Sequence, residues 1–349
     1  MIEVGLVGFG LAGRAFHAPV IRAVPGLHLA AILQRTGTEA AEKYPDVQIV
    51  RSMDELLAIR EIRLIVIATP NATHYPFAKQ CLEAGRDVLV DKPFATTLEE
   101  AKSLVEIAEK TGRLLTVYQN RRYDGDFQAI QQLVEAGTLG HIVRFETTYD
   151  RFRPQLKPGA WRETTQPGSG ILFDIAPHLI DHALMLFGLP EVVTADVRAE
   201  REHALAGDAF DITLHYPKGL RAVLRSGILA AAPRPRFVLL GTQGSFVKQA
   251  FDPQEMNLRR GYIPEGKPWG DEPEENWGVL TIPAGESFEH RRIPSAACDY
   301  RDYYANLRDA ILGKAALAVT PEYALDVMRM LELARASSER QCTISWTHE

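Results

Sequence analysis

A glycine-rich turn near the N-terminus restricts the fold of this chain more strongly than any other feature of its sequence. The turn Gly8–Gly13 has the pattern G-x-G-x-x-G and directly follows the apolar run Ile2–Val7. In this pattern the first glycine permits a tight turn, the second lets the backbone approach a pyrophosphate, and the third lets a helix pack on a strand. A helical pattern over Ala15–Val24 and a second apolar run, Leu27–Leu33, follow. This context predicts a dinucleotide-binding βαβ unit; a glycine-rich turn without a ligand is the alternative.

The first third of the chain continues as an alternation of short apolar runs and helical patterns. Such alternation is typical of a mostly parallel, doubly wound sheet. Thr97 and Glu100 have the spacing of a capping box at the start of one helix. The expected strands are Leu64–Ala68, Val88–Val90 and Leu114–Val117, and the expected helices are Tyr75–Ala84 and Leu98–Lys110.

Beyond residue 120 the strand patterns alternate with period two, as half-solvated strands do. The chain of 349 residues is too long for one ordinary core, since domains usually run about 100–200 residues. We therefore predict an α/β protein with a Rossmann domain over residues 1–119 and a C-terminal α/β domain over residues 120–349 with a large open, mostly antiparallel sheet. Residues 252–292 give no clear pattern. The expected strands are 141–149, 192–198, 210–216, 221–226 and 237–240, and the expected helices are 130–136, 175–187, 300–312 and 321–337.

The end of the second strand indicates which dinucleotide binds. Chains that bind NAD usually place Asp or Glu about 20 residues after the glycines, where the carboxylate bonds the ribose 2′-hydroxyl. Here Gln34 occupies that place and Arg35 follows it. A guanidinium attracts a 2′-phosphate that a carboxylate would repel, so the sequence favours NADP, with NAD still open. The alternative is that Arg35 is a solvated loop residue.

The candidate catalytic groups are a lysine, Lys92, and an aspartate–histidine pair, Asp174 and His178. Lys92 follows the buried strand Val88–Val90, and ligands of open α/β sheets sit beyond the carboxyl ends of strands. Asp174 and His178 are four residues apart, so a helix places them on one face. Pro177 is expected in the first turn of that helix, because deeper in a helix it would break it, so Asp174 could be only an N-cap.

The same segment allows a metal site as an alternative. His178 and His182 have the i, i+4 spacing of zinc ligands. However, no Glu follows the first histidine and no third ligand is evident, so we expect no metal. Acid/base chemistry needs a histidine and a carboxylate that orients it, and this spacing supplies both.

Composition narrows the partners and the compartment. The formal charge of −6, without blocks of like charge, argues against nucleic acid or an anionic membrane as the main partner. Three scattered cysteines, Cys81, Cys298 and Cys342, form no CxxC pair and indicate a reducing compartment. No signal peptide or run of about 20 apolar residues is evident, so a cytoplasmic location is expected.

Four segments together resemble the Gfo/Idh/MocA oxidoreductases, named for glucose-fructose oxidoreductase and inositol dehydrogenase. They are GFGLAGRAFHAP (Gly8–Pro19), ATPNATH (Ala68–His74), DKP (Asp91–Pro93) and GSGILFDIAPHLIDHAL (Gly168–Leu184). The resemblance covers essentially the whole chain. It implies an N-terminal Rossmann domain and a C-terminal substrate-binding domain whose open sheet face commonly makes a homodimer, with a homotetramer as the other expectation.

Three further segments are most similar to the NADP-dependent scyllo-inositol dehydrogenase branch of that family. They are NRRYD (Asn120–Asp124), DRFRPQ (Asp150–Gln155) and the stretch from Gly244 to Glu255 that contains GSFVK and DPQE. The implied substrate is a small polyol or sugar. An aldose, a ketosugar or a biliverdin-like acceptor is an alternative. A dinucleotide-sensing regulator, which some branches contain, is a further alternative that we would expect to lose the lysine and histidine.

The resemblance also implies roles for single residues. Lys92 matches the lysine of the usual EKP motif, which helps hold the substrate hydroxyl and the nicotinamide; Asp91 replaces the Glu and keeps a carboxylate with a shorter reach. His178 is the implied acid/base and Asp174 its partner. The expected cofactor-binding residues are Gly8, Phe9, Gly10, Leu11, Ala12, Gly13, Gln34, Arg35, Thr69, Pro70, Asn71, His74, Asp91 and Lys92. The expected substrate-binding residues are Asn120, Arg121, Arg151, Trp161 and His178, with Arg153 as a weaker candidate.

Overall fold

The computed structural model describes residues 1–157, 159–266 and 269–346 and divides into two compact units. The first comprises Met1–Asn120, Gln254–Trp269 and Asp299–Met328. The second comprises Arg121–Pro253, Gly270–Cys298 and Arg329–Glu349. The first unit thus includes two segments that the sequence analysis placed in the C-terminal domain. We describe each unit by itself.

The sheet of the first unit is fully parallel, with the order β3-β2-β1-β4-β5-β6. Its strand order reverses between β1 and β4, and the crevice beyond the carboxyl ends there is where doubly wound sheets bind ligands. This confirms the predicted Rossmann fold. Strand β3 has only three residues and was not predicted. The strands are β1 (Ile2–Val7), β2 (Leu27–Leu33), β3 (Gln48–Val50), β4 (Ile62–Ile67), β5 (Asp87–Val90) and β6 (Leu115–Val117).

The helix after the glycine turn begins earlier than predicted. It starts as a π-helix, η1 (Ala12–His17), and continues as α1 (Ala18–Ala23), where Pro19 lies in the first turn. The capping box of α5 (Leu98–Thr111) is only partly confirmed. Thr97 Oγ1 accepts from the Glu100 N–H at 3.2 Å, but Glu100 accepts from the Thr96 N–H, one residue before the cap.

The remaining helices of the first unit cover the sheet or come from the two returning segments. They are α2 (Glu39–Lys43), α3 (Met53–Ala58), the 3-10 turn η2 (Asn71–Thr73), α4 (His74–Glu83), α8 (Gln254–Arg259) and α9 (Tyr300–Ile311). Helix α10 (Pro321–Arg340) begins in this unit and ends in the second.

The second unit is built on a nine-stranded sheet with the order β14-β13-β12-β11-β7-β10-β9-β8-β15. Its neighbours are antiparallel except for β7 and β10, which confirms the predicted mostly antiparallel sheet. The strands are β7 (Ile142–Thr148), β8 (Val192–Arg198), β9 (Ala209–His215), β10 (Arg221–Gly227), β11 (Phe237–Gly241), β12 (Gly244–Lys248), β13 (Gly278–Ala284), β14 (Ser287–Ile293) and β15 (Ile344–Ser345).

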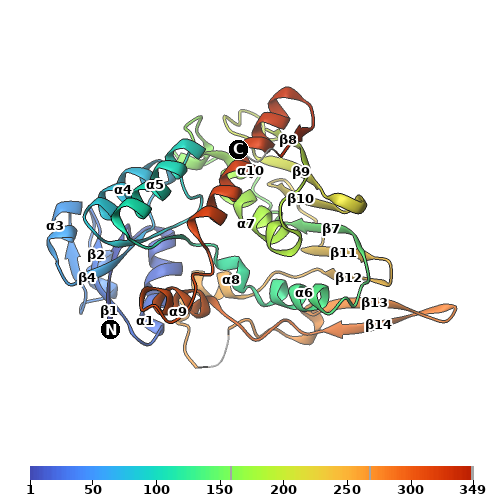
Figure 1. Cartoon of the computed structure of the whole chain (residues 1–349), viewed down its shortest axis with the longest axis horizontal. Coiled ribbons are helices and arrows are strands. Elements are labelled where there is room, and N and C mark those ends of the chain that lie inside the picture. The colour runs from blue at the N-terminus through green and yellow to red at the C-terminus, as the bar shows by residue number, and fades with distance from the viewer. Residues whose placement is uncertain (158, 267–268, 347–349) are drawn as a thin grey trace. The chain divides into compact units, whose positions relative to one another are not determined.

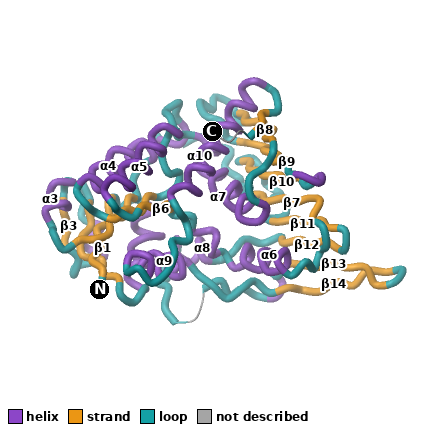
Figure 2. The backbone as a smooth tube through the Cα atoms, in the orientation of Figure 1, coloured by secondary structure: helices purple, strands orange, loops and turns teal. Residues whose placement is uncertain are grey.

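Helices cover one face of this sheet, as Figure 1 shows for α6 (Gly125–Glu135) and α7 (Gly170–Phe187). Inward residues such as Phe145 and Ile212 are fully buried, while their neighbours along each strand are charged or half-exposed. Strands β13 and β14 form a long hairpin, visible in Figure 2, from the stretch that had no clear sequence pattern.

Helix α7 corrects two expectations. It begins at Gly170 after the N-cap Ser169, five residues before the predicted start, so Asp174 is not the N-cap. Pro177 lies inside the helix and not in its first turn. Such a proline removes one backbone hydrogen bond and costs about 3 kcal/mol. Nearly all residues from Gly170 to Leu184 are buried, and we infer that this burial offsets the cost.

The length and apolar composition of α7 would allow it to cross a membrane. However, 72% of its 18-residue stretch is buried inside the protein. A buried core helix can have the same length and composition, and α7 packs on β7, β9 and β10 as a core helix does.

Candidate functional site

The glycine turn in the first unit has the geometry of a phosphate cradle. The Gly8 N–H donates to the Leu33 carbonyl at 3.0 Å, and a Cβ on Gly8 would lie 2.7 Å from the Ala68 carbonyl oxygen. A Cβ on Gly13 would lie only 2.1 Å from the Gly8 carbonyl oxygen, whereas one on Gly10 would meet nothing within 4 Å. Gly8 and Gly13 are therefore required by packing. Gly10 leaves open the space that a pyrophosphate needs, so this turn fits a dinucleotide.

The loop after β2 is held by Gln34, which the sequence analysis named, and by Arg51, which it missed. Gln34 binds the start of α2: its Oε1 accepts from the Ala40 N–H at 2.9 Å, and its Nε2 donates to Glu39. Arg51 Nη1 donates to the Gln34 carbonyl at 2.7 Å and to the Gly37 carbonyl at 2.9 Å. Arg51 follows β3 in the chain, so no local pattern could link it to this loop.

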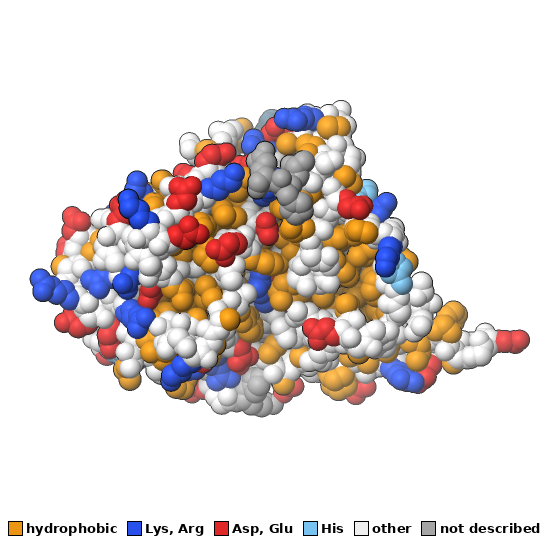
Figure 3. Space-filling model, viewed as in Figure 1, with side chains coloured by type: hydrophobic (Ala, Val, Ile, Leu, Met, Phe, Trp, Pro, Cys, Tyr) orange, Lys and Arg blue, Asp and Glu red, His pale blue; other side chains and the backbone are white. Residues whose placement is uncertain are grey.

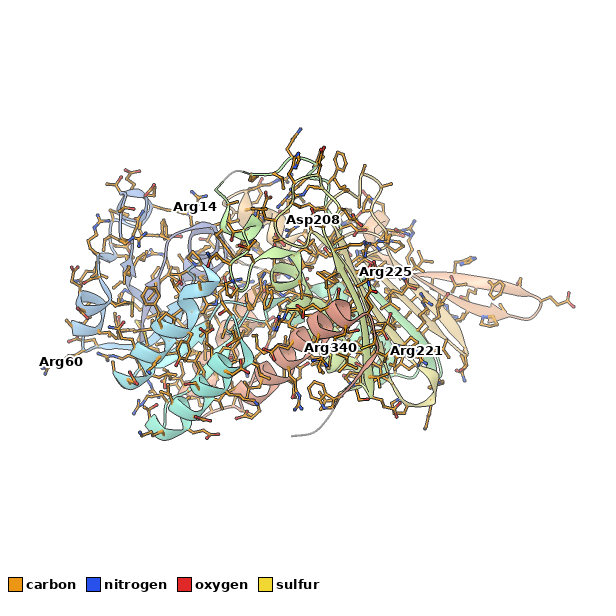
Figure 4. All side chains as sticks on the ribbon, turned by 90° about the horizontal axis from the view of Figure 1, so that it is seen from above. Arg14, Arg60, Asp208, Arg221, Arg225 and Arg340 are labelled. Carbon is orange, nitrogen blue, oxygen red and sulfur yellow. The ribbon has the colours of Figure 1, made fainter. Side chains whose placement is uncertain are left out.

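Positive charge surrounds this loop. Arg35 is exposed within it, and Arg14, also exposed, lies on η1 (Figure 4). The pKa of Glu39 is below its usual value because of backbone and Gln34 hydrogen bonds, with a smaller contribution from Arg14. Burial lowers the pKa of Lys43, and Arg14 adds to the effect. The Glu39 carboxylate beside the loop is thus already occupied by hydrogen bonds.

The segment after β4 is anchored by a buried histidine. His74 Nδ1 lies 2.8 Å from the Pro93 carbonyl oxygen and its Nε2 lies 2.9 Å from the Thr69 carbonyl oxygen. Burial lowers the pKa of His74. Asn71 is buried in η2, between Pro70 and His74. The expected cofactor residues on this segment are therefore joined to the segment that carries Lys92.

Asp91 is the centre of a second buried network in the first unit. Its Oδ1 accepts from the Lys92 N–H at 2.8 Å, and its Oδ2 lies 3.6 Å from His17 Nε2. Burial raises the pKa of Asp91, but His17, Lys92 and His74 outweigh burial and hold it below its usual value. His17 Nδ1 lies 2.6 Å from the hydroxyl of Tyr304. The Lys92–Pro93 peptide bond is cis.

In the second unit, α7 presents Asp174 between two arginines. Arg151 Nη1 donates to Asp174 Oδ2 at 3.1 Å, and Arg162 Nε donates to Asp174 Oδ1 at 3.3 Å. The Arg162 guanidinium also stacks on the Trp161 ring, 4.3 Å from its centroid. The structure thus brings Asp174 together with Arg151 and the neighbourhood of Trp161, three residues predicted from separate segments.

The two histidines of α7 differ in their surroundings. His178 is 5% exposed and lies one turn after Asp174. His182 is fully buried, stacks on Phe127 at 4.1 Å between ring centroids, and its Nε2 lies 3.3 Å from the Arg121 carbonyl oxygen. Burial, reinforced by Arg236, holds the pKa of His182 well below its usual value. His182 therefore has the contacts of a core residue.

The structure also tests the alternative of a metal site. Among the described residues, no three His, Cys, Asp or Glu side chains are grouped so that they could hold a metal ion.

Other predicted substrate residues occupy less accessible places. Arg121 is buried, donates to Asp124 Oδ2 and to the Tyr149 hydroxyl, both at 3.1 Å, and stacks on the Tyr149 ring. Asn120 begins the 3-10 turn η3 (Asn120–Tyr123) and is half-buried. Their substrate roles stay predictions.

A hollow in the second unit opens beside Asp174. Its empty volume, including its open mouth, is about 630 Å³. Arg151 and Arg153, both named from the sequence, line it together with Arg162. Arg201, which the sequence analysis missed, lines it too and comes from the loop after β8.

The chain matches two described families over most of its length. Residues 2–119 match the oxidoreductase family with an NAD-binding Rossmann fold, and residues 127–247 match the GFO/IDH/MocA C-terminal domain. Among curated proteins it is 37% identical to a scyllo-inositol 2-dehydrogenase (NADP(+)) of Bacillus subtilis, over 99% of this chain and 96% of that protein. It is 42% identical to the uncharacterized oxidoreductase YdgJ of Escherichia coli, over 98% of both chains.

Solved structures agree over the whole chain. The oxidoreductase yvaA of Bacillus subtilis superposes with a TM-score of 0.95 at 37% identity, covering 99% of this chain and 98% of that one. The oxidoreductase YPO2259 of Yersinia pestis superposes with a TM-score of 0.93 at 39% identity, covering 100% of this chain and 98% of that one.

Proposed function

The chain belongs to the GFO/IDH/MocA oxidoreductase family, and from this we propose that it transfers a hydride between NADP(H) and a secondary alcohol of a cyclic polyol or sugar, such as an inositol. The observation that carries this proposal is α7, which presents an arginine-held Asp174 one turn before His178 beside an open hollow. The full-length similarity to a scyllo-inositol 2-dehydrogenase supports the choice of substrate class.

The proposed NADP preference rests on the loop after β2. A 2′-phosphate placed there would meet Arg35, with Arg14 and Arg51 nearby, and the neighbouring carboxylate of Glu39 is held by Gln34. Arginine binds phosphate by charge-assisted hydrogen bonds. The similar scyllo-inositol 2-dehydrogenase is named for NADP, which supports the same choice here.

In the proposed mechanism, His178 accepts the proton of the substrate hydroxyl during oxidation and returns it during reduction. When bound, the nicotinamide supplies hydride transfer. Asp174 orients the imidazole and stabilises its protonated form, while Arg151 and Arg162 fix the carboxylate. Lys92 is the proposed group that polarises the substrate oxygen as the carbonyl develops. The Asp91 hydrogen bond to the Lys92 N–H would hold this lysine's backbone in place.

The first experiment is a titration of the purified protein with NADPH and NADH, followed by quenching of tryptophan fluorescence, and then a screen of polyols with NADP⁺. We expect NADPH to bind at least about tenfold more tightly, since one charge-assisted hydrogen bond is worth that factor. Arg35→Ala should remove most of that preference and leave NADH binding unchanged. Tighter NADH binding would overturn the cofactor choice, and binding of neither would overturn the whole proposal.

The same screen distinguishes the proposed function from two alternatives. Turnover of an aldose or ketosugar but not of inositols would identify a related reductase or dehydrogenase. A dinucleotide-sensing regulator would bind the cofactor and turn over no substrate. The presence of Lys92, Asp174 and His178 favours an enzyme.

We also propose a cytoplasmic homodimer or homotetramer that binds a small molecule and neither nucleic acid nor membrane. The formal charge of −6 and the interspersed acidic and basic side chains on the face in Figure 3 argue against a nucleic-acid or membrane partner.

A further inference from the structure

A fully buried histidine of the first unit faces the segment that carries Lys92. His17 is the last residue of η1, and none of its side chain is exposed. Its ring packs on Tyr118, with 4.4 Å between the ring centroids. A buried imidazole needs polar neighbours for its two nitrogens, because burying a polar group without a partner costs free energy. The proposed mechanism gives this residue no role, so these neighbours indicate what it does.

The hydroxyl of Tyr304 holds one of the two ring nitrogens. It lies 2.6 Å from His17 Nδ1, and Tyr304 is itself fully buried. Tyr304 follows His17 by 287 residues and belongs to α9, which packs beside α1 in the first unit (Figure 1). A short contact between two buried side chains fixes the direction in which the imidazole points.

The other ring nitrogen faces Asp91. His17 Nε2 lies 3.6 Å from Asp91 Oδ2, which is within ion-pair distance and slightly longer than a hydrogen bond. Asp91 is ionised at neutral pH, because its pKa lies below the usual value. An ionised carboxylate only accepts hydrogens, so we infer that the hydrogen of Nε2 points toward it. In a neutral ring, Nδ1 then accepts the hydrogen of the Tyr304 hydroxyl.

The carboxylate of Asp91 connects His17 to Lys92. Its other oxygen, Oδ1, accepts from the Lys92 N–H at 2.8 Å. A carboxylate that faces one donor at each oxygen has a defined plane, and it holds the peptide that contains the Lys92 N–H. A continuous series of contacts therefore runs from Tyr304 through His17 and Asp91 to the backbone of Lys92.

Burial and neighbouring groups act on Asp91 in opposite directions. Burial raises the pKa of Asp91, whereas His17 lowers it most, followed by Lys92 and by His74 of α4. Tyr304 of α9 also faces this carboxylate: burial raises the pKa of its hydroxyl, and the Asp91 charge adds to that effect. Among these neighbours, His17 is the one whose loss would raise the pKa of Asp91 most.

We propose that His17, held by Tyr304, is a positioning residue for the active-site lysine. It holds the Asp91 carboxylate in place, and Asp91 in turn fixes the backbone from which the Lys92 side chain extends. The inference rests on the proposed function of Lys92 and deepens it. Because His17 is fully buried, it acts through Asp91 and not by contact with the substrate.

Oxidation of scyllo-inositol by NADP⁺, measured as a function of pH, tests this role. His17→Phe keeps a ring against Tyr118 and removes both nitrogens, and we expect it to lower kcat by up to about 100-fold. The acid limb of its pH profile should move to higher pH, because the pKa of Asp91 rises and a protonated carboxyl binds the Lys92 N–H less strongly. His17→Gln keeps an N–H donor beside Asp91 and should recover most of the loss.

Two neighbouring tyrosines of α9 provide a matched pair of variants. Tyr304→Phe removes only the hydroxyl that holds His17 and should lower kcat by about tenfold, the value of one hydrogen bond. Tyr303→Phe removes a buried hydroxyl that donates to the Val117 carbonyl at 2.8 Å, and it should leave kcat and the pH profile unchanged.

NADPH titration and thermal unfolding distinguish positioning from packing. Both should stay close to the wild-type values in His17→Gln and in Tyr304→Phe. Equal losses of kcat in the Tyr303 and Tyr304 variants, or an unchanged kcat and pH profile in His17→Phe, would overturn the inference. A loss of kcat that only follows a loss of NADPH binding and thermal stability would overturn it too, and would make His17 a packing residue.

A measurement without turnover separates this inference from the proposed function. The pKa of Asp91 is followed by the carboxyl resonance of ¹³C-labelled aspartate, assigned with Asp91→Asn, in the wild-type protein and in His17→Phe. A higher pKa in the variant supports the link from His17 to Asp91, and if no polyol is oxidised, only the proposed function fails. An unchanged pKa overturns the inference, whereas oxidation of a polyol would still support the proposed function.

Discussion

The proposed roles of Asp174 and His178 depend on the neighbouring arginines as well as on the two side chains themselves. The carboxylate of Asp174 receives hydrogen bonds from two arginines and so stays fixed beside the next turn of α7, which carries His178. A carboxylate held in this way can orient an imidazole without taking its proton.

Replacing His178 should remove the proposed acid/base group while leaving the cofactor site intact. We expect His178→Asn to lower kcat by about 10²–10⁴-fold, the usual contribution of general acid/base catalysis. Steady-state kinetics and NADPH titration measure the two effects. His141→Asn, at an exposed histidine of the same unit, is the control. A parallel loss of NADPH binding and of thermal stability would make His178 structural instead.

The buried His182 should make stability depend on pH. Its folded-state pKa is lowered by burial, whereas an unfolded histidine titrates near about 6.5. As pH falls below that value the unfolded state gains a proton that the folded state does not, so stability is lost at up to about 1.4 kcal/mol per pH unit. His74, whose pKa is also lowered, contributes in the same direction.

Urea unfolding at pH 7.5 and pH 5.5 measures this effect. His182→Phe keeps an aromatic ring against Phe127 and removes the titrating group. The wild-type protein should lose about 1 kcal/mol more than this variant between the two pH values. An identical loss in both proteins would mean that His182 takes up its proton in the folded state.

At the scale of the elements, the glycine turn joins β1 to η1, and its glycines serve different purposes. Gly13 is needed for packing, and Gly10 leaves room for the ligand. A methyl group on Gly13 would collide with the Gly8 carbonyl, whereas a methyl group on Gly10 would extend into open space. The two glycines are thus matched controls for each other.

Gly13→Ala should lower the stability of the protein by about 1–3 kcal/mol, the usual cost of overpacking, and weaken NADPH binding with it. Gly10→Ala should leave the thermal midpoint unchanged and still weaken NADPH binding, because its methyl group occupies the place of the pyrophosphate. Differential scanning calorimetry and fluorescence titration separate the two. If Gly10→Ala binds NADPH normally, the turn does not cradle the cofactor as proposed.

At the scale of the whole molecule, the open face of the nine-stranded sheet is the proposed contact between copies of the chain. Arg225 donates to Asp211 and to Glu146 across this face, and Leu240 is 38% exposed beside Arg144 in register. Figure 4 shows Arg221 and Arg225 on strand β10 of this sheet. Such mixed ionic and apolar surfaces are usual at protein interfaces.

Light scattering should therefore give two or four times the chain mass of 38.8 kDa. Leu240→Glu places a charge in the proposed interface and should lower the measured mass at low protein concentration, with unchanged circular dichroism. An unchanged mass for this variant would place the contact elsewhere, and a monomeric wild-type protein would refute it.

The doubly wound sheet and the phosphate turn could be predicted because their signals are local. Apolar runs, helical periodicity and glycine spacing each lie within about 20 residues, and backbone sterics act over the same range. The same locality let Asp174 and His178 be paired from their spacing alone. Family resemblance, and not physical pattern, supplied the expected roles of Thr69 and Trp161, whereas the position of Lys92 after a buried strand already indicated a place near the ligand.

Only the tertiary structure decided which side chains surround these groups. Arg51 supports the loop after β2, and Arg162 and Arg201 complete the charged hollow, because folding brings separate elements and loops into hydrogen-bond distance. The tertiary structure also placed Pro177 inside α7. We infer that burial of the surrounding residues outweighs the lost backbone hydrogen bond, which is why the sequence predicted this proline in the first turn. Local sequence thus determined the elements and the turn, while packing between separate elements and loops determined the charge around the site.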